Sequence, residues 1–189
     1  MNIHYALQTC DIASNQSQKR YCSDSKTEIV KRCVTSFFQS VQYAAKQRPE
    51  SNHIIQIFDD RSTEDLRDYL RFLVSKYNHD NIIVDITFIS QGGVMNSIRS
   101  CWEWLEQYGT DLVYQVQDDY LYDETAIFEM VNVFFQVARD TDTHPLIQPY
   151  NDPYSWYHTY KYRPTPRIMV MGQSRYWIQS YDTSCSFMT

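Results

Sequence analysis

Apolar residues follow two alternating patterns over roughly the first 140 residues of the chain. Short apolar runs at residues 4–9, 54–58, 81–89 and 112–116 have the length of buried strands. Each run is followed by a longer segment whose apolar residues are spaced three and four apart, as on one face of an amphipathic helix. The order strand-helix, repeated four times, predicts a mainly parallel sheet with helices on both faces.

The helical segments have recognisable start signals. Residues 25–28, Ser-Lys-Thr-Glu, form a capping-box pattern, and residues 62–65, Ser-Thr-Glu-Asp, can cap the second helix. Gly92-Gly93 precedes the third helix as a turn between strand and helix. The expected helical segments contain the apolar positions 29–41, 66–77 and 98–105, and the fourth helix extends from residue 124 to about residue 139.

The last third of the chain does not continue this alternation. Five of the six prolines lie between residues 145 and 166, which indicates irregular structure. A late strand is expected at residues 167–171, and short strands at 177–178 and 186–188. Because no internal repeat and no linker is present, the chain is expected to be one Rossmann-like α/β domain with an irregular C-terminal region.

Composition narrows the class of protein. The chain has 189 residues, 43% of them hydrophobic, which suits one folded domain. A net charge of −6 without a Lys/Arg-rich run disfavours binding to nucleic acid. Five cysteines without a CxxC pair are typical of reduced thiols, and no signal peptide or membrane span is recognisable. We therefore expect a cytoplasmic protein.

Paired carboxylates follow two of the predicted strands. Asp118-Asp119 comes directly after the apolar run 112–116 and Gln117, and Asp59-Asp60 comes after the run 54–58. The carboxyl ends of parallel strands meet at one edge of a sheet, where open α/β sheets bind ligands. Mg²⁺ and Mn²⁺ prefer oxygen ligands and often bridge a carboxylate to substrate phosphates. The sequence therefore predicts a divalent-metal site at this edge.

Motifs at four strand ends resemble those of GT-A-fold glycosyltransferases, particularly the family-2-like group. They are Gln-Thr-Cys-Asp at 8–11, Asp-Asp-Arg-Ser-Thr at 59–63, Gly-Gly-Val-Met-Asn-Ser-Ile-Arg at 92–99 and Gln-Asp-Asp at 117–119. The resemblance covers roughly the first 140 residues. It implies a nucleotide-sugar-binding half at 1–122 and an acceptor-side half at 123–189.

Four departures from the family pattern affect what the resemblance implies. Arg61 stands where glycine is usual, so the turn after the second strand can differ, and Gln117 replaces the first Asp of the common Asp-x-Asp motif. The acidic motif that supplies the base of inverting members is not recognisable, and neither is the Gln-x-x-Arg-Trp motif of processive synthases. A polysaccharide synthase is therefore not expected, and the stereochemical outcome stays open.

The resemblance implies a metal-dependent hexosyltransferase. Such an enzyme moves a sugar from a nucleotide-diphosphate sugar, here expected to be a UDP-sugar, to a hydroxyl of a carbohydrate or other acceptor, with Mn²⁺ or Mg²⁺. Asp119 is the expected direct metal ligand, and Asp118 would hold the metal, a metal-bound water or the ribose hydroxyls. The alternative is that one of the two caps the following helix.

Further donor-site residues follow from the same resemblance. Asp60 is expected to accept the uracil N3–H, and Asp59 to lie near the base or to form the turn before the second helix. Thr9 and Asp11 would contact the nucleotide, or serve as ordinary loop residues. The last group lies at the start of the third helix: Gly93 would let the backbone approach the nucleotide, and Asn96 and Arg99 would face the diphosphate or the solvent.

The catalytic base or nucleophile is expected in the C-terminal third. Asp152, His158 and Asp182 are the candidates, and His158 could instead be a third metal ligand. Arg175 could contact a phosphate or an acidic acceptor. Each of these also has an ordinary structural explanation.

Two other functions use the same residues. A Mg²⁺-dependent phosphohydrolase could be built on the paired carboxylates, although the first strand does not end in the Asp-x-Asp nucleophile of haloacid-dehalogenase-like enzymes. A non-catalytic carbohydrate-binding protein of the same fold would suit the tyrosine-rich segment from Tyr150 to Tyr162. Turnover of the donor separates the enzyme from the binding protein.

Overall fold

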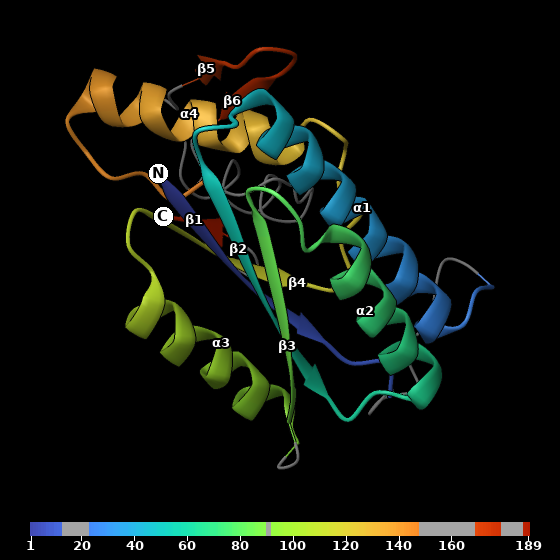
Figure 1. Cartoon of the computed structure of the whole chain (residues 1–189). Coiled ribbons are helices and arrows are strands. Elements are labelled where there is room, and N and C mark those ends of the chain that lie inside the picture. Colours follow the sequence, from blue (N-terminus) through green and yellow to red (C-terminus); the bar gives the residue numbers. More distant parts are fainter. Residues whose placement is uncertain (13–22, 90–91, 148–168, 179–186) are drawn as a thin grey trace, which may run out of the picture.

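The computed structural model describes residues 1–12, 23–89, 92–147, 169–178 and 187–189. Four parallel strands form the centre of the main sheet (Figure 1). They are β1 (Asn2–Thr9), β2 (Asn52–Asp60), β3 (Ile82–Ile89) and β4 (Leu112–Gln117). A short fifth strand, β7 (Phe187–Met188), pairs antiparallel with β4, so the order is β3-β2-β1-β4-β7. The predicted α/β class with a mainly parallel sheet is confirmed.

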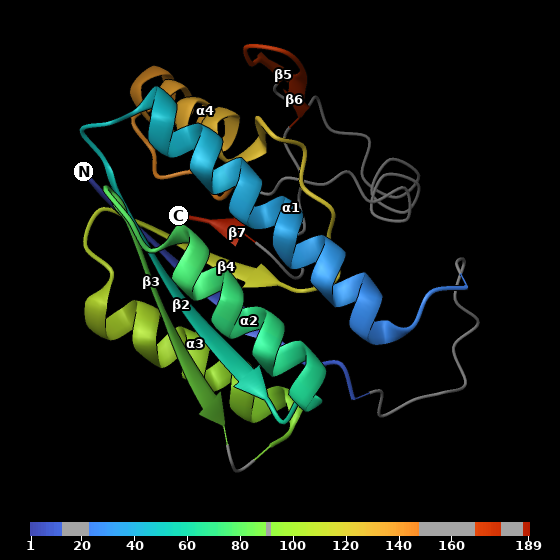
Figure 2. The same cartoon turned by 45° about the vertical axis from the view of Figure 1, so that its right-hand side comes forward.

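Four helices connect and cover these strands. They are α1 (Lys26–Gln47), α2 (Glu64–Tyr77), α3 (Val94–Tyr108) and α4 (Ala126–Thr141). Helices α1, α2 and α4 lie on one face of the sheet and α3 lies on the other (Figures 1 and 2). The predicted helices on both faces are therefore confirmed, with an uneven division between the faces.

Side chains of each strand alternate between two hydrophobic clusters. Ile3, Tyr5 and Leu7 of β1 belong to the large cluster beneath α1, α2 and α4 and are fully buried. Ala6 points to the opposite face and packs with Phe58 and the α3 residues in a smaller cluster. Burial on both faces explains why the strands are nearly continuous apolar runs in the sequence.

The predicted start signals of α1 and α2 are confirmed. Ser25 is the N-cap of α1, and its hydroxyl accepts the Glu28 N–H at 3.2 Å. The N-cap of α2 is Thr63, within the predicted segment 62–65. The Ser62 hydroxyl instead accepts the backbone N–H of Asp11 at 3.3 Å, so it joins two loops.

The late strands form a separate hairpin that rests on α4. Strands β5 (Met169–Met171) and β6 (Tyr176–Ile178) pair antiparallel. β5 lies within the predicted strand at 167–171, and β6 contains the predicted strand at 177–178. Arg175 in the hairpin turn lies 3.1 Å from Glu129 and 3.2 Å from Asp123. Arg175 is therefore engaged by carboxylates at the start of α4, whereas the sequence suggested a phosphate or an acceptor.

The sequence predicts no membrane-spanning segment. Within the described ranges, none of the helices is both long enough and apolar enough to do so.

The buried face of α2 provides a test of the packing. Leu70 is fully buried, whereas Phe72 on the same helix is 55% exposed. Leu70→Ala should lower the free energy of unfolding by about 2–5 kcal/mol, because it leaves a cavity in the large cluster. Phe72→Ala should cost less than about 1 kcal/mol. Urea denaturation measures both values, and equal losses would contradict this orientation of α2.

Candidate functional site

The carboxyl ends of β1 and β4 meet at the point where the strand order reverses. From β1 the chain builds outward through β2 and β3, and α3 then returns it to the other side of β1 as β4. Gln8 of β1 pairs with Gln117 of β4, so Cys10 and Asp118 follow next to each other. The Cys10 N–H donates a hydrogen bond of 2.7 Å to Asp118 Oδ2. Ligands of open α/β sheets bind at such a switch point.

The two carboxylates at this point are in an environment that disfavours their charge. Burial raises the pKa of Asp118 to about 6, and the neighbouring Asp119 adds to this increase, whereas Lys26 and the Cys10 N–H oppose it. The side chain of Asp119 is exposed overall. The surrounding protein still removes part of the water around its carboxyl, and this raises the pKa of Asp119 as well. The site therefore has two adjacent oxygen donors that would gain from a bound cation.

Helix capping does not account for this pair. The N-cap residue of α4 is Thr125, and Asp118 and Asp119 lie well before it. Asp123 accepts the Thr125 N–H at 3.0 Å and its hydroxyl at 2.8 Å, so Asp123 serves the start of the helix. The alternative that Asp118 or Asp119 caps α4 is wrong.

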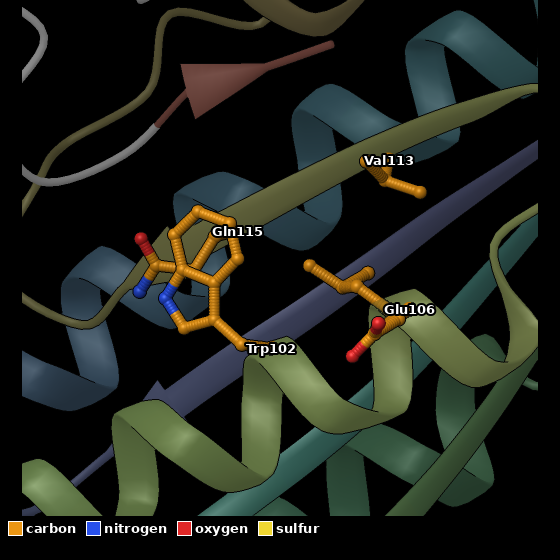
Figure 3. A pocket seen from close by; sticks show the side chains of 5 residues that line it. Trp102, Glu106, Val113 and Gln115 are labelled. Carbon is orange, nitrogen blue, oxygen red and sulfur yellow. The ribbon is translucent and has the colours of Figure 1, made fainter.

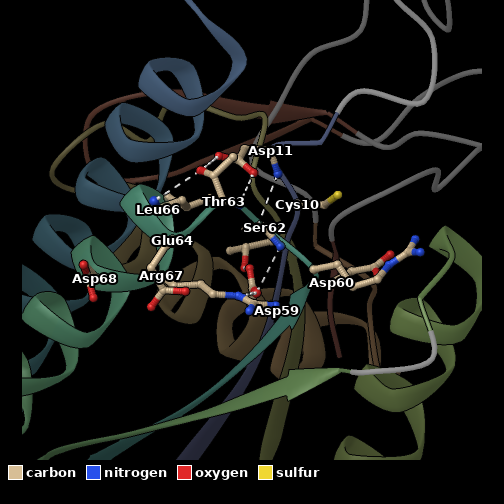
Figure 4. A network of polar contacts seen from close by, with 12 residues as sticks. Cys10, Asp11, Asp59, Asp60, Ser62, Thr63, Glu64, Leu66, Arg67 and Asp68 are labelled. Atoms are coloured by element: carbon tan, nitrogen blue, oxygen red, sulfur yellow. Dashed lines mark hydrogen bonds and ion pairs between the residues drawn. The ribbon is translucent and has the colours of Figure 1, made fainter.

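Asp11 joins three segments of the chain. Its carboxylate accepts the Thr27 hydroxyl at 2.8 Å. It also accepts the Thr63 N–H at 2.8 Å and the Thr63 hydroxyl (Figure 4). Burial alone would raise the pKa of Asp11, but the hydrogen bonds from Thr63 and Thr27 outweigh it and lower the pKa. The side chain therefore fixes the loop after β1 to the starts of α1 and α2. A contact with the nucleotide stays a prediction.

Thr9 and Asp59 are paired neighbours at the carboxyl ends of β1 and β2, and both are fully buried. Asp59 accepts the Thr9 hydroxyl at 3.2 Å, the Ser62 N–H at 3.3 Å and Arg67 Nε at 3.0 Å (Figure 4). These contacts favour the role of a turn former for Asp59, which pairs its charge with Arg67. Contact of either residue with a ligand stays a prediction.

Asp60 holds the start of α3. It accepts the Gly93 N–H on Oδ2 and Arg61 Nε on Oδ1, both at 3.0 Å. Gly93 has a φ of 131°, which side chains rarely adopt. Arg61 has a φ of 56°, in the left-handed region that glycine adopts most easily. The expected difference of this turn from the family pattern stays a prediction.

The two polar residues predicted on α3 are exposed. Asn96 and Arg99 both lie on the surface of the helix. Their expected contact with a diphosphate stays a prediction. The candidate catalytic residues Asp152, His158 and Asp182 lie outside the described residues.

Lys26 is a residue of this site that the sequence reasoning missed. It is the first residue of α1, and its neighbour Thr27 is bound to Asp11. Its positive charge acts against burial and lowers the pKa of both Asp118 and Asp119. The signal was present, because the capping box at 25–28 predicts that α1 begins at this edge of the sheet.

A metal at the carboxylate pair would need ligands from elsewhere. In the part of the chain that the structure describes, three or more His, Cys, Asp or Glu side chains do not gather as a metal site. Asp118 and Asp119 nevertheless offer the hard oxygen donors that Mg²⁺ and Mn²⁺ bind. The residues therefore fit a metal that takes its remaining ligands from water and a bound phosphate.

A hollow of about 300 Å³ lies on the other side of the sheet, between α3 and β4 (Figure 3). It is lined by Trp102, Leu105, Glu106, Val113 and Gln115. None of these lining residues is a predicted site residue, so the hollow is separate from the carboxylate edge.

Comparisons with known proteins leave the family open. No family model matches this chain, and a search of curated proteins finds no match either. The fold and the site define an α/β protein with a parallel, Rossmann-like sheet centre and an acidic pair at its switch point. Membership of the GT-A glycosyltransferases stays a prediction from the motifs.

The raised pKa of Asp118 predicts a dependence of stability on pH. The unfolded carboxyl ionises above about pH 4, but the folded one ionises only above about pH 6. Between these values the folded state binds the additional proton, so this group makes the protein less stable as the pH rises. Asp118→Asn keeps an acceptor for Cys10 and cannot ionise. At pH 8 it should therefore be more stable than the wild type, by on the order of 1–3 kcal/mol.

Urea denaturation in EDTA at pH 4 and pH 8 measures this effect. The advantage of Asp118→Asn should be present at pH 8 and absent at pH 4. An advantage of equal size at both pH values would show that ionisation of Asp118 is not its cause.

Proposed function

We propose that this protein is a metal-dependent glycosyltransferase that moves a sugar from a UDP-sugar to an acceptor hydroxyl. The observation that carries the proposal is the carboxylate pair Asp118-Asp119 at the switch point of the sheet, with Asp118 bound to the end of β1 through Cys10. This is where a parallel sheet of this kind binds its ligand. The motifs at the other strand ends, read as a resemblance, suggest the donor class.

In this proposal the pair holds Mn²⁺ or Mg²⁺ together with the donor diphosphate. Asp119 is exposed and would be a direct ligand. Asp118 has one oxygen bound by Cys10 and would use the other for the metal or for a ribose hydroxyl. When bound, the metal would act as a Lewis acid that stabilises negative charge on the leaving diphosphate.

Residues of the chain itself orient the donor around this pair. Lys26 places a positive charge near the carboxylates, where it would attract the diphosphate. Asp60 is buried and each of its oxygens already accepts one bond, from Arg61 or Gly93, so it would receive the base N–H on a remaining lone pair. Asp11, Asp59 and Thr9 would contribute indirectly, because their hydrogen bonds fix the loops at the strand ends. The base remains assigned to Asp152, His158 or Asp182.

A phosphohydrolase is less compatible with these contacts. The acidic residue after β1 would be its nucleophile, but both oxygens of Asp11 accept hydrogen bonds from Thr27 and Thr63. These bonds also fix Asp11 to two helix starts, so attack on a phosphate would break the local structure. A carbohydrate-binding protein without activity would share donor binding and differ only in turnover.

Asp119→Ala should abolish metal-dependent nucleotide binding while the fold is retained, because Asp119 is exposed. The measurement is a thermal-shift screen of the full chain with UDP, GDP, CMP and their sugars in Mn²⁺, Mg²⁺ or EDTA. At a hundredfold excess over Kd, a ligand adds about 2.7 kcal/mol of stability. For a chain of this size that raises Tm by roughly 5–10 °C.

The control variant is Glu124→Gln, which removes an exposed carboxylate from the same loop. It should keep the full shift with UDP and Mn²⁺. Loss of the shift in EDTA, together with its loss in Asp119→Ala only, would support the proposal. If no nucleotide raises the Tm of the wild type with either metal, the proposal is wrong.

A further inference from the structure

The loop that carries the carboxylate pair is attached to α1. This loop connects β4 to α4, from Asp118 to Thr125. The backbone N–H of Tyr122 donates a hydrogen bond of 2.9 Å to Ser36 Oγ on α1. The Ser36 hydroxyl in turn donates to the Cys33 carbonyl at 2.7 Å. Because the Ser36 hydroxyl donates its proton to the Cys33 carbonyl, its oxygen is left to accept the N–H from the loop.

Tyr122 is the buried anchor of this exposed loop. Its side chain is 8% exposed, whereas the preceding Leu121 is 67% exposed. The Tyr122 hydroxyl lies 2.7 Å from the Tyr114 hydroxyl of β4, and its ring meets Phe37 of α1 edge-on at 5.4 Å between centroids. The residue is therefore fixed by its backbone, its ring and its hydroxyl.

A second serine of α1 makes a similar bond beyond the loop. Ser40 Oγ accepts the N–H of Ile127 at 3.0 Å, in the first turn of α4. The N-cap residue Thr125 makes no side-chain capping bond, so Ser40 supplies a cap from another helix. Ser36 and Ser40 thus make the same kind of contact one helical turn apart, but only Ser36 reaches the loop of the carboxylates.

We propose that Ser36 and Tyr122 are positioning residues, which fix the backbone of Asp118 and Asp119 in the geometry that binds a divalent cation. The metal role rests on the proposed function. The pair is held on one side by the Cys10 N–H on Asp118 and on the other by Tyr122, three residues after Asp119. Without the second attachment, the segment after Asp119 would lose its hydrogen bond to α1.

The position of a ligand pair affects metal affinity strongly. Groups that orient the direct ligands typically change metal affinity by about 10-fold to 100-fold when they are removed. Ser36 acts one step further away, through the backbone, so the low end of that range is expected.

The experiment compares Ser36→Ala with Ser40→Ala in the full chain. Mn²⁺ affinity is measured by the EPR signal of free Mn²⁺, with Mn²⁺ alone and with UDP. Ser36→Ala should weaken Mn²⁺ binding by about 10-fold. Ser40→Ala loses a matched hydrogen bond and should lower the urea midpoint similarly, yet leave the Mn²⁺ Kd within about twofold. Ser36→Thr, which keeps the hydroxyl, should restore most of the affinity.

An equal effect of the two alanine variants on Mn²⁺ affinity would overturn the positioning role, and so would an unchanged Kd in Ser36→Ala. If the wild type binds no Mn²⁺ with or without UDP, the proposed function fails instead. The attachment is then judged by amide hydrogen exchange. Ser36→Ala should speed exchange at residues 119–123 relative to Ser40→Ala, and unchanged exchange there would overturn the attachment.

Discussion

The hydrogen bond from the Cys10 N–H to Asp118 depends on the pairing of β1 with β4, and the rest of the site depends on that pairing. β1 is the central strand, with β2 on one side and β4 on the other. Because α3 carries the chain across the opposite face of the sheet, residues more than 100 positions apart become neighbours at one edge.

The acidic residues at the edge differ in how far their hydrogen bonds offset the effect of burial. Asp11 and Asp59 accept hydrogen bonds from hydroxyl, amide or guanidinium groups, so their charges stabilise the loops. Asp118 and Asp119 are placed where burial disfavours charge. A group that costs stability in the unliganded fold is typical of functional sites. This contrast, rather than the number of carboxylates, distinguishes the candidate metal ligands from the structural ones.

The sequence predicted the strands and helices well because their apolar periodicity is regular and each face of the sheet is buried. It also predicted that Asp59, Asp60, Asp118 and Asp119 follow strand ends. It could not assign their roles, because the bonds from the Cys10 N–H to Asp118 and from the Tyr122 N–H to Ser36 join residues distant in the sequence. For the same reason the sequence could not predict that the Ser62 hydroxyl accepts the Asp11 N–H and joins two loops. Local patterns locate such residues, and tertiary contacts decide what they do.

The turn at Arg61 has a consequence for how this protein can vary. A Cβ added at Gly92 would lie 1.6 Å from Arg61 Nε, so a larger residue at 92 is incompatible with the present position of that arginine. Arg61 in turn has the left-handed φ that glycine adopts most easily. A side chain at 92 would therefore displace the exposed Arg61 guanidinium and remove its hydrogen bond to Asp60 Oδ1. Gly92 thus helps to keep Asp60 in the position that holds the start of α3.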